Sequence, residues 1–356
     1  MNLLVTGGAG FIGSNLVRHI IHQPEIGRLV NLDCLTYAGH LENLGDVQSH
    51  PKYVFEQADL RCKAAVEETI RRHGITHVMH LAAESHVDRS IVGPDDFIYT
   101  NVVGTFHLLE ACRNCWAANL DGRRFLHVST DEVYGSLGLS GKFTEETPYA
   151  PSSPYSASKA SSDMLVRAYH HTYALPIVIT NCSNNYGPYQ LPEKLIPVVI
   201  QKLIQRQPIP VYGDGLNVRD WLYVLDHAEA LWCVLEKGRS GQTYNIGGNN
   251  EWPNLRIVER ICDLIDELRP ELGGNSRNLI TFVADRPGHD RRYAIDATKV
   301  NRELGWEPRH DFATGLRLTV SWYLENQSWL ERVTDQHRVA GAYKSPADAM
   351  VDRRGT

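Results

Sequence analysis

Residues 129–132, Ser-Thr-Asp-Glu, place a hydroxyl and two adjacent carboxylates where an apolar strand should end. Two neighbouring carboxylates repel each other, so their pKa values should separate, which suits one general acid and one general base. Because successive strand residues face opposite sides, both acids can face one ligand only if the chain bends at 131–132. We therefore expect a turn there, ended by Gly135.

A second pair of residues has the types needed for hydride transfer. Tyr155 and Lys159 are four residues apart in a segment with a helical pattern, so both side chains share one helix face. The lysine should favour the phenolate and lower the tyrosine pKa. Such a tyrosine can take a hydroxyl proton while hydride leaves the same carbon, and the lysine can hydrogen-bond a nicotinamide ribose. We expect Thr130 to hydrogen-bond the substrate hydroxyl or the tyrosine.

The N-terminal segment predicts a dinucleotide site. Gly7, Gly10 and Gly13 follow an apolar strand and open an amphipathic helix, which allows a tight turn, close approach to a pyrophosphate and an anion at the helix N-terminus. Asp33 ends the second strand, where a carboxylate accepts a ribose 2′-OH and repels a 2′-phosphate; this favours NAD over NADP. The alternative is that Asp33 only caps a loop. Asp59-Leu60, after the third strand, should contact the adenine.

Strands and helices alternate through the first 180 residues. We expect strands at 2–7, 28–33, 52–59, 77–83, 124–130 and 176–181, and helices at 10–21, 62–73, 94–117 and 154–173. This order predicts an α/β fold, a Rossmann-type doubly wound parallel sheet.

Prolines and glycines make the second half less regular, with helices expected near 193–205, 226–236, 254–268 and 311–326. We predict an NAD-binding domain over 1–180, with elements from about 225–250 returning to it. A smaller α/β sugar-nucleotide-binding domain follows over 181–330, and a C-terminal tail over 331–356.

Composition excludes several classes of function. The 356 residues carry 36 basic and 42 acidic side chains without a basic block, which argues against nucleic acid. No apolar run is long enough for a membrane span, and the start lacks a signal-peptide pattern, so we expect a cytoplasmic protein. Seven cysteines are an odd number for a disulfide scaffold, and Cys112/Cys115 form a CxxC inside a predicted helix without a second such motif. We expect no metal site.

Several motifs together resemble a known family. TGGAGFIG, HLAAESHVD, STDEVYG, YSASK and NNYGPYQ resemble the extended short-chain dehydrogenase/reductase superfamily, whose members act on nucleotide sugars. STDEVYG, NCSNNYGPYQLPEKLIP, RDWLYV and DRPGHDRRYAID narrow the resemblance to the dTDP-glucose 4,6-dehydratases, over about residues 1–330. It implies tightly bound NAD, a hydro-lyase, and a homodimer formed through the helices near 94–117 and 154–173. The family usually has an acid where this chain has Leu225, which weakens only a helix cap.

The resemblance implies unequal roles for the two acids. Tyr155 and NAD⁺ oxidise a glucose C4 hydroxyl, and the resulting ketone acidifies C5–H and makes the C6 hydroxyl a β-leaving group. Glu132 takes the C5 proton and Asp131 protonates the departing C6 hydroxyl. Hydride returns to C6, which gives dTDP-4-keto-6-deoxyglucose for deoxysugar biosynthesis, for example of rhamnose.

The resemblance also implies further ligand contacts, each of which could singly be a packing or solvated loop residue. Lys194 lies at a helix start that welcomes an anion, Pro210 to Tyr212 can form a wall for a base, and Arg219 has the planar fork that matches a diphosphate. The implied cofactor contacts are Phe11, Ile12, Leu81, Ala83, Thr100 and Asn185. The implied substrate contacts are Ser85, Asn184, Lys194, Leu195, Pro210, Tyr212, Arg219, Asn254, Asp285, Arg286 and His289.

Three alternatives remain open. A nucleotide-sugar 4-epimerase or decarboxylase would also use Tyr155, Lys159 and NAD, but needs no acid and base for dehydration. A second class of dehydratase, acting on another nucleotide sugar, keeps the glutamate but not the Asp131-Glu132 pair. A non-catalytic NAD- or sugar-nucleotide-binding regulator would bind without turnover. The choice between thymidine and uridine depends on one ring methyl and is left open by these residues.

Overall fold

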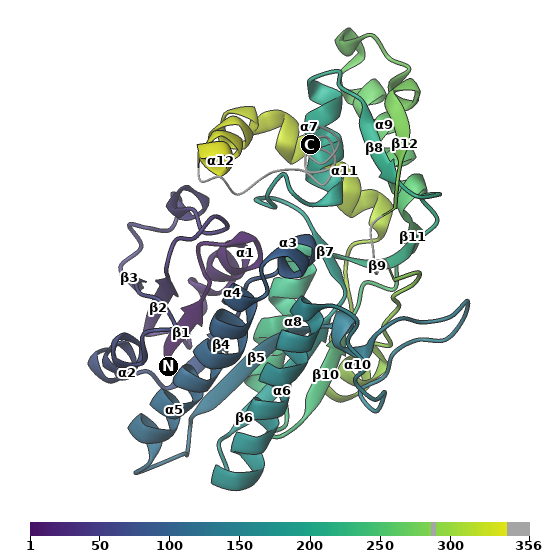
Figure 1. Cartoon of the computed structure of the whole chain (residues 1–356). Helices are drawn as coiled ribbons and strands as arrows, with labels where there is room; N and C mark the ends of the chain where they lie inside the picture. Colours follow the sequence, from purple (N-terminus) through teal and green to yellow (C-terminus); the bar gives the residue numbers. More distant parts are fainter. Residues whose placement is uncertain (286–289, 340–356) are drawn as a thin grey trace, which may run out of the picture.

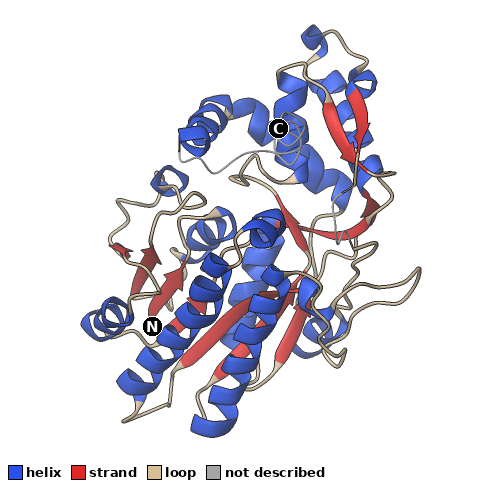
Figure 2. Cartoon of the chain, in the orientation of Figure 1, coloured by secondary structure: helices blue, strands red, loops and turns tan. Residues whose placement is uncertain are grey.

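Apolar strands from across the chain pair into one central sheet. In the computed structural model, which describes residues 1–285 and 290–339, seven parallel strands form this sheet in the order β10-β6-β5-β4-β1-β2-β3 (Figures 1 and 2). The predicted doubly wound parallel sheet is confirmed. The strands are β1 (Asn2–Thr6), β2 (Arg28–Asp33), β3 (Tyr53–Gln57), β4 (His77–His80), β5 (Arg124–Thr130), β6 (Ile177–Cys182) and β10 (Thr243–Ile246).

Helices cover both faces of the sheet because successive strand residues are apolar on both sides. Leu3 and Val5 of β1 belong to the core beneath α1 and α8, whereas Leu4 between them belongs to the core beneath α2, α5 and α6. None of the helices in the described ranges is long and apolar enough to cross a membrane. These covering helices are α1 (Phe11–Ile20), α8 (Val224–Lys237) and α10 (Thr298–Leu304) on one face, and α2 (Lys63–Arg72), α5 (Thr105–Trp116) and α6 (Pro154–Tyr173) on the other.

The chain bends at the end of β5, as we predicted from the need for both acids to face one ligand. Thr130 caps a 3₁₀ turn, η3 (Asp131–Tyr134), by accepting the Glu132 amide at 3.3 Å. Gly135 ends the turn with φ +88°, and a Cβ there would lie 2.5 Å from the carbonyl oxygen of Ala150. The predicted turn at 131–132 is confirmed.

The start of α6 is set by its local sequence. Ser153 and Ser156 form a reciprocal capping box, with a backbone-to-hydroxyl bond of 3.1 Å to Ser153 Oγ and one of 3.0 Å to Ser156 Oγ, and proline occupies the first helical position. The helix then runs unbroken to Tyr173. Because residues four apart share a face, Tyr155 and Lys159 both lie toward β5.

The segment 94–117 is not the single regular helix that its pattern predicted. After α3 (Val87–Val92), the chain forms α4 (Asp95–Phe97), a π-helical segment η2 (Ile98–Gly104) and then α5. The buried Asn101 of this segment bonds both backbone groups of Glu84: its Nδ2 donates to the carbonyl at 3.0 Å and its Oδ1 accepts the amide at 2.8 Å. The wider helical turn therefore directs Asn101 at the chain that leaves β4.

The second half of the chain builds a smaller assembly beside the sheet (Figure 1). A three-stranded sheet has the order β11-β9-β7, and β12 pairs with β8. Several short elements here were not expected from the sequence, because strands of a few residues show too little periodicity. The elements are β7 (Asn184–Tyr186), β8 (Ile209–Tyr212), β9 (Val218–Tyr223), β11 (Glu251–Pro253), β12 (Ile280–Val283), α7 (Leu195–Ile204), α9 (Asn254–Leu268), α11 (Phe312–Glu325) and α12 (Gln327–Val339), with 3₁₀ turns η1 (Leu41–Leu44), η4 (Pro270–Leu272) and η5 (Ser276–Leu279).

Helix α12 crosses the position where a C-terminal tail was expected to begin. Its buried Trp329, Leu330 and Val333 join the core of the second half, and Trp329 Nε1 donates to Asn43 Oδ1 at 2.9 Å. The first residues of the predicted tail 331–356 are therefore helical, whereas 340–356 lie outside the described residues. The division at residue 180 stays a prediction, although β10 does pair with β6 in the main sheet.

Candidate active site

A cavity of about 650 Å³ lies where the carboxyl ends of the parallel strands meet the second half of the chain. This edge is where ligands bind in open α/β sheets. The cavity brings together all five predicted catalytic residues: Thr130, Asp131, Glu132, Tyr155 and Lys159. It is also lined by every predicted cofactor contact: Gly7, Gly10, Phe11, Ile12, Gly13, Asp33, Asp59, Leu60, Leu81, Ala83, Thr100, Asn185 and the Tyr155–Lys159 pair.

The glycine loop fits a pyrophosphate because backbone alone forms its surface. Gly7 has φ +73°, and a Cβ there would lie 2.8 Å from the backbone of Ala82. A Cβ on Gly13 would lie 2.1 Å from the carbonyl oxygen of Gly7, so the first turn of α1 approaches the loop as closely as a glycine allows. The N-terminus of α1 then lies at the cavity, where its free N–H groups favour an anion.

Asp33 both caps a loop and lies where it could contact a ribose, the two alternatives that the sequence left open. Its carboxylate caps the local loops, with Oδ2 accepting the Ala9 amide and Oδ1 the Leu35 amide, each at 2.9 Å. It also lines the cavity at the end of β2. Burial raises the pKa of this carboxyl group despite the two amides. A carboxylate at this point fits the ribose of NAD and leaves no room for the charge of a 2′-phosphate.

The Tyr155–Lys159 pair is almost completely buried, with 8% and 4% of each residue exposed. Burial, followed by the charge of Glu132, raises the pKa of Tyr155 well above its usual value, while a hydrogen bond with Thr130 opposes this. The prediction that Lys159 lowers this pKa is therefore wrong for the protein alone. The first reason is burial of the tyrosine; in addition, Lys159 Nζ donates to the carbonyl of Val128 at 2.8 Å, on β5.

The two acids of the 3₁₀ turn are unequal. Asp131 is 2% exposed, and burial, then the charges of Glu132 and Asp220, raise its pKa well above the usual value; Arg219 opposes the shift. Glu132 is only half-buried and lies at the same cavity. Burial therefore favours the protonated form of Asp131, which is the property a general acid needs.

The predicted substrate contacts divide into two groups. Ser85, Asn184 and Lys194 line the cavity, and Lys194 Nζ donates to the Ser85 carbonyl at 3.2 Å, which links the two halves of the chain. The other described ones do not line it: Leu195, Pro210, Tyr212, Arg219, Asn254 and Asp285. Arg286 and His289 lie outside the described residues.

Arg219 lies beside the acid pair, tied to backbone. Its guanidinium donates to the carbonyls of Val218 at 2.8 Å and Asp290 at 2.9 Å, and stacks 4.3 Å above the ring of Tyr293. Because the Arg219 charge opposes the rise in the Asp131 pKa, Arg219 lies on the side of the site that holds the acid pair. Its expected diphosphate contact stays a prediction.

Some residues at the cavity were not predicted. Cys182 and Ser183 line it at the end of β6, and the rule that parallel strands present their carboxyl ends to ligands could have found them. Tyr37 and Arg89 also line it, with the guanidinium 3.8 Å above the ring. No sequence signal joins these two, since only the folded chain brings them together.

The raised pKa of Asp131 predicts a cost in stability. Below the unfolded-state pKa of about 3.9 both states hold the proton; as pH rises toward the folded-state value, the unfolded chain loses it first, so the free energy of unfolding falls. The free energy of unfolding of Asp131→Asn should not show this fall, because the asparagine does not titrate. We expect the variant to match wild type at about pH 4 and to be more stable by about 1–3 kcal/mol at about pH 8. Urea unfolding at both pH values measures this, with the exposed Asp121→Asn as control. Equal stability of wild type and Asp131→Asn at the higher pH would contradict the assignment.

Comparison with known proteins agrees with this geometry. The family model described as GDP-mannose 4,6 dehydratase matches residues 4–319. The chain is 58% identical over 337 residues to a dTDP-glucose 4,6-dehydratase of Xanthomonas campestris pv. campestris (strain B100), covering 93% of this chain and 95% of that protein.

Solved structures show the same likeness. The dTDP-glucose 4,6-dehydratase of Streptomyces venezuelae, solved with NAD and TYD bound, superimposes with a TM-score of 0.86 at 46% identity, covering 94% of this chain and all of that one. The UDP-glucose 4-epimerase of Thermus thermophilus, in complex with NAD, has a TM-score of 0.81 at 30% identity over 92% of this chain and 100% of its own. The identity is thus higher to the dehydratases, and this chain belongs to the family of the dTDP-glucose 4,6-dehydratases.

Proposed function

We propose that this chain is an NAD-dependent dTDP-glucose 4,6-dehydratase, a hydro-lyase that forms dTDP-4-keto-6-deoxyglucose for deoxysugar biosynthesis, such as that of rhamnose. The observation that carries the proposal is the buried Asp131, whose pKa is raised by burial, beside Glu132 and in the same cavity as Tyr155 and Lys159. Relatives of this name, and a neighbour solved with NAD and TYD, support it. The proposal includes a cytoplasmic location.

Residues at one end of the cavity serve the redox chemistry. The glycine loop and the N-terminus of α1 would hold the pyrophosphate of NAD, and Asp33 its adenosine ribose. When bound, NAD⁺ supplies the oxidation of C4, and in its reduced form the reduction of C6. Tyr155 takes the proton of the C4 hydroxyl once the positive charge of a bound nicotinamide adds to that of Lys159 and favours the phenolate. Because oxidation and reduction cancel, the dinucleotide can stay bound through the reaction.

Residues at the 3₁₀ turn serve the loss of water. Once C4 is a ketone, Glu132 takes the acidified C5 proton and Asp131 gives its proton to the departing C6 hydroxyl. After C6 is reduced, C5 receives a proton again, so the product differs from the substrate by one water. Thr130, which bonds to Asp131 at 3.4 Å and caps the turn, is placed to orient the sugar and the tyrosine.

The acid pair also separates the alternatives. The epimerase scaffold has a TM-score of 0.81 to this chain, so the fold and the Tyr155–Lys159 pair cannot distinguish the two reactions. An epimerase has no leaving group to protonate and no C5 proton to remove. The buried Asp131 beside Glu132 would have no task in it, nor in a binding regulator.

The decisive experiment uses dTDP-glucose deuterated at C4. A dehydratase moves the deuterium to C6 of a product lighter by one water, which mass spectrometry and proton NMR can locate. Deuterium that stays at C4 would contradict the proposal, and a C4 epimer of unchanged mass would establish the epimerase instead. Binding of the nucleotide sugar without turnover would favour the regulator.

Variants at the two ends of the site should stop the reaction at different stages. Asp131→Asn and Glu132→Gln lack the acid or the base but keep Tyr155, so C4 is still oxidised and reduced dinucleotide accumulates while overall turnover falls about 10²–10⁴-fold. Tyr155→Phe should abolish that accumulation. Stopped-flow absorbance of the reduced nicotinamide, beside product formation, measures both stages. The assignment fails if Glu132→Gln loses the oxidation as completely as Tyr155→Phe.

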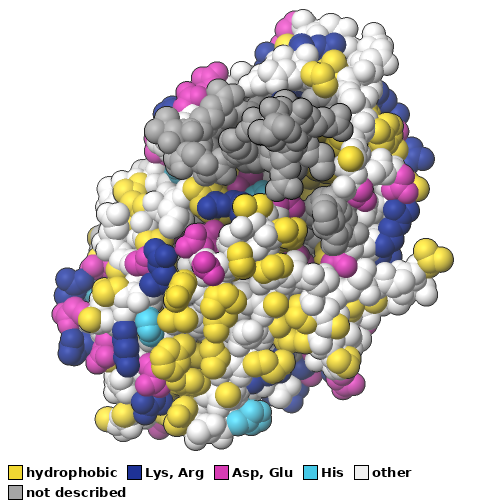
Figure 3. Space-filling view, viewed as in Figure 1, with side chains coloured by type: hydrophobic (Ala, Val, Ile, Leu, Met, Phe, Trp, Pro, Cys, Tyr) yellow, Lys and Arg dark blue, Asp and Glu magenta, His cyan; other side chains and the backbone are white. Residues whose placement is uncertain are grey.

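We also propose that the enzyme is a homodimer. Large apolar side chains lie exposed along η2, α5 and α6, which lie side by side, and Figure 3 shows hydrophobic side chains gathered over these helices. A contiguous apolar face of this kind marks an interface. The occupant that we propose is a second copy of this chain, which the resemblance to the extended short-chain dehydrogenase/reductases implies. The exposed residues are Ile98, Tyr99, Phe106, Met164 and Tyr173, with Ile91 and Val92 on α3.

Light scattering at micromolar concentration should give twice the chain mass. Met164→Asp, a charge placed where 51% of the residue is exposed, should shift the enzyme toward the monomer. Leu318→Asp, equally apolar and 45% exposed but on α11, is the matched control and should leave the dimer intact. A wild-type monomer at this concentration would contradict the proposal.

A further inference from the structure

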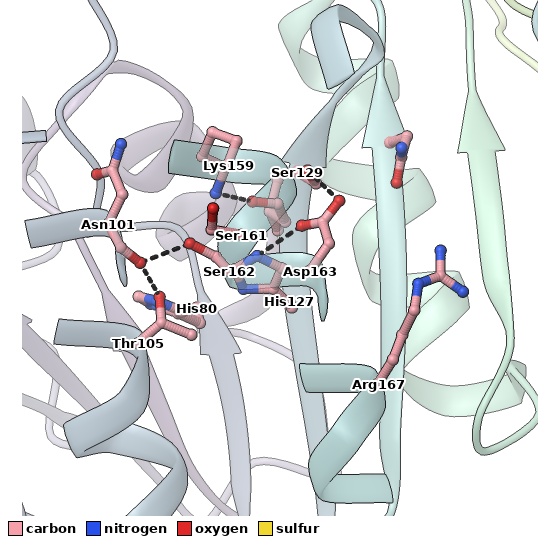
Figure 4. A network of polar contacts seen from close by, with 12 residues as sticks. His80, Asn101, Thr105, His127, Ser129, Lys159, Ser161, Ser162, Asp163 and Arg167 are labelled. Carbon is pink, nitrogen blue, oxygen red and sulfur yellow. Dashed lines mark hydrogen bonds and ion pairs between the residues drawn. The ribbon is translucent and has the colours of Figure 1, made fainter. Parts of the chain in front are cut away.

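Helix α6 directs three ionisable side chains at β5, one turn apart: Tyr155, Lys159 and Asp163. The third, Asp163, is fully buried and does not line the cavity, and no step of the proposed reaction uses it. Figure 4 shows it between Ser129 and His127, with Lys159 one turn along the same helix.

The Asp163 carboxylate is held from three sides. Its Oδ2 accepts hydrogen bonds from Ser129 Oγ and from the hydroxyl of Tyr149, both at 2.8 Å. Its Oδ1 lies 3.1 Å from Nε2 of His127, which is also fully buried. Ser129 directly precedes Thr130, so this carboxylate anchors the end of β5 from which the acid pair projects.

A carboxylate buried this deeply needs a cation nearby. His127 is not that cation, because burial lowers its pKa to about 4 and leaves the ring neutral at neutral pH. Arg167, one turn further along α6, is one cation of this cluster and donates to the Tyr149 hydroxyl at 3.2 Å. The other cation is Lys159, one turn before Asp163 on the same helix; 4% of this residue is exposed, and its ammonium donates its hydrogen bond to the neutral Val128 carbonyl.

We propose that Asp163 is the anionic partner that keeps the buried Lys159 ammonium charged, which makes it a positioning residue for the Tyr155–Lys159 pair. The inference rests on the proposed function, in which Lys159 must be a cation beside Tyr155. Residues four apart on a helix are neighbours, and opposite charges so placed in a dry interior attract far more strongly than in water. Burial lowers the pKa of Lys159, and Asp163 is the first group that opposes this shift.

The other titratable groups near Lys159 do not replace this charge. His80 on β4 has a pKa lowered well below its usual value, and the thiol of Cys182 on β6 has a pKa raised to about 12, so both are neutral. Burial raises the pKa of Tyr155 on α6 and of Asp131 on η3, which favours the uncharged form of each. Glu132 is half-buried and faces the cavity, where its proposed role is to accept the C5 proton.

The test is the pH dependence of Asp163→Asn. Lys159 is charged below its pKa, so a lower pKa moves the loss of the cation to lower pH. The alkaline limb of kcat should move down by about 1–3 pH units, and the pH at which NAD affinity falls should move with it. Asp163→Glu, which restores the charge, should return both limbs toward wild type. Tyr149→Phe removes one hydrogen bond but no charge, and should leave both limbs in place.

A purely structural role gives a different result: Asp163→Asn would lower the amount of folded enzyme but keep the wild-type limbs, which would overturn the inference. Wild-type turnover of dTDP-glucose is measured first, so a failure of the proposed function is seen separately.

A double-mutant cycle covers the case in which Asp163→Asn folds poorly. If the two residues pair, Asp163→Asn should destabilise much less in a Lys159→Met background, where no buried cation is left unpaired. Equal losses of unfolding free energy in both backgrounds would contradict the pairing.

Discussion

The contact between α6 and the end of β5 is the interaction on which the site depends. The Lys159 ammonium donates to the Val128 carbonyl, and one turn later the Asp163 carboxylate accepts the Ser129 hydroxyl. These two contacts fix the helix against the strand in one register. Tyr155, one turn earlier, then lies beside Thr130, and the acids that follow Thr130 reach the same cavity.

The parallel sheet supplies the remaining constraint. All of its strands end at one edge, so polar residues that are far apart in the sequence meet there without any local signal that joins them. Several buried ionisable side chains lie at this edge, and burial raises the pKa values of two of them, Asp33 and Asp131. Burial thus lowers the stability of the charged forms and at the same time prepares a carboxyl group to act as an acid.

The sequence predicted the parts of the site whose geometry is local. The glycine loop, the Tyr155–Lys159 spacing and the bend after Thr130 follow from the conformational needs of a few adjacent residues. The Asp163–His127 contact could not be predicted, because the two residues lie on different elements far apart in the sequence and only the packing of α6 on β5 joins them. The direction of the Tyr155 pKa shift was missed for the same reason: sequence spacing shows a neighbouring cation but not the burial of both groups or the direction of the lysine.

The second half of the chain was predicted least well. Its strands are too short for periodicity to show, and α12 is held by only a few apolar residues such as Trp329 and Val333. Arg219 was recognised by type as an anion partner, but its bonds to two carbonyls depend on the loop that carries Asp290. Residue types indicate which interactions a side chain can make, whereas long-range packing decides which atoms that side chain contacts.

The π-helical segment η2 joins the part of the chain that contacts the end of β4 to the exposed apolar face. A regular α-helix advances about 100° per residue, so each residue that a π-helical turn adds rotates everything after it by about that angle. Within this segment Asn101 is directed at the chain leaving β4; downstream of it, Phe106 is exposed on the apolar face. Loss of one residue between 98 and 104 would restore regular winding and turn one of these faces away. The chain length of this segment therefore links the direction of a residue at the catalytic edge to that of the exposed apolar face.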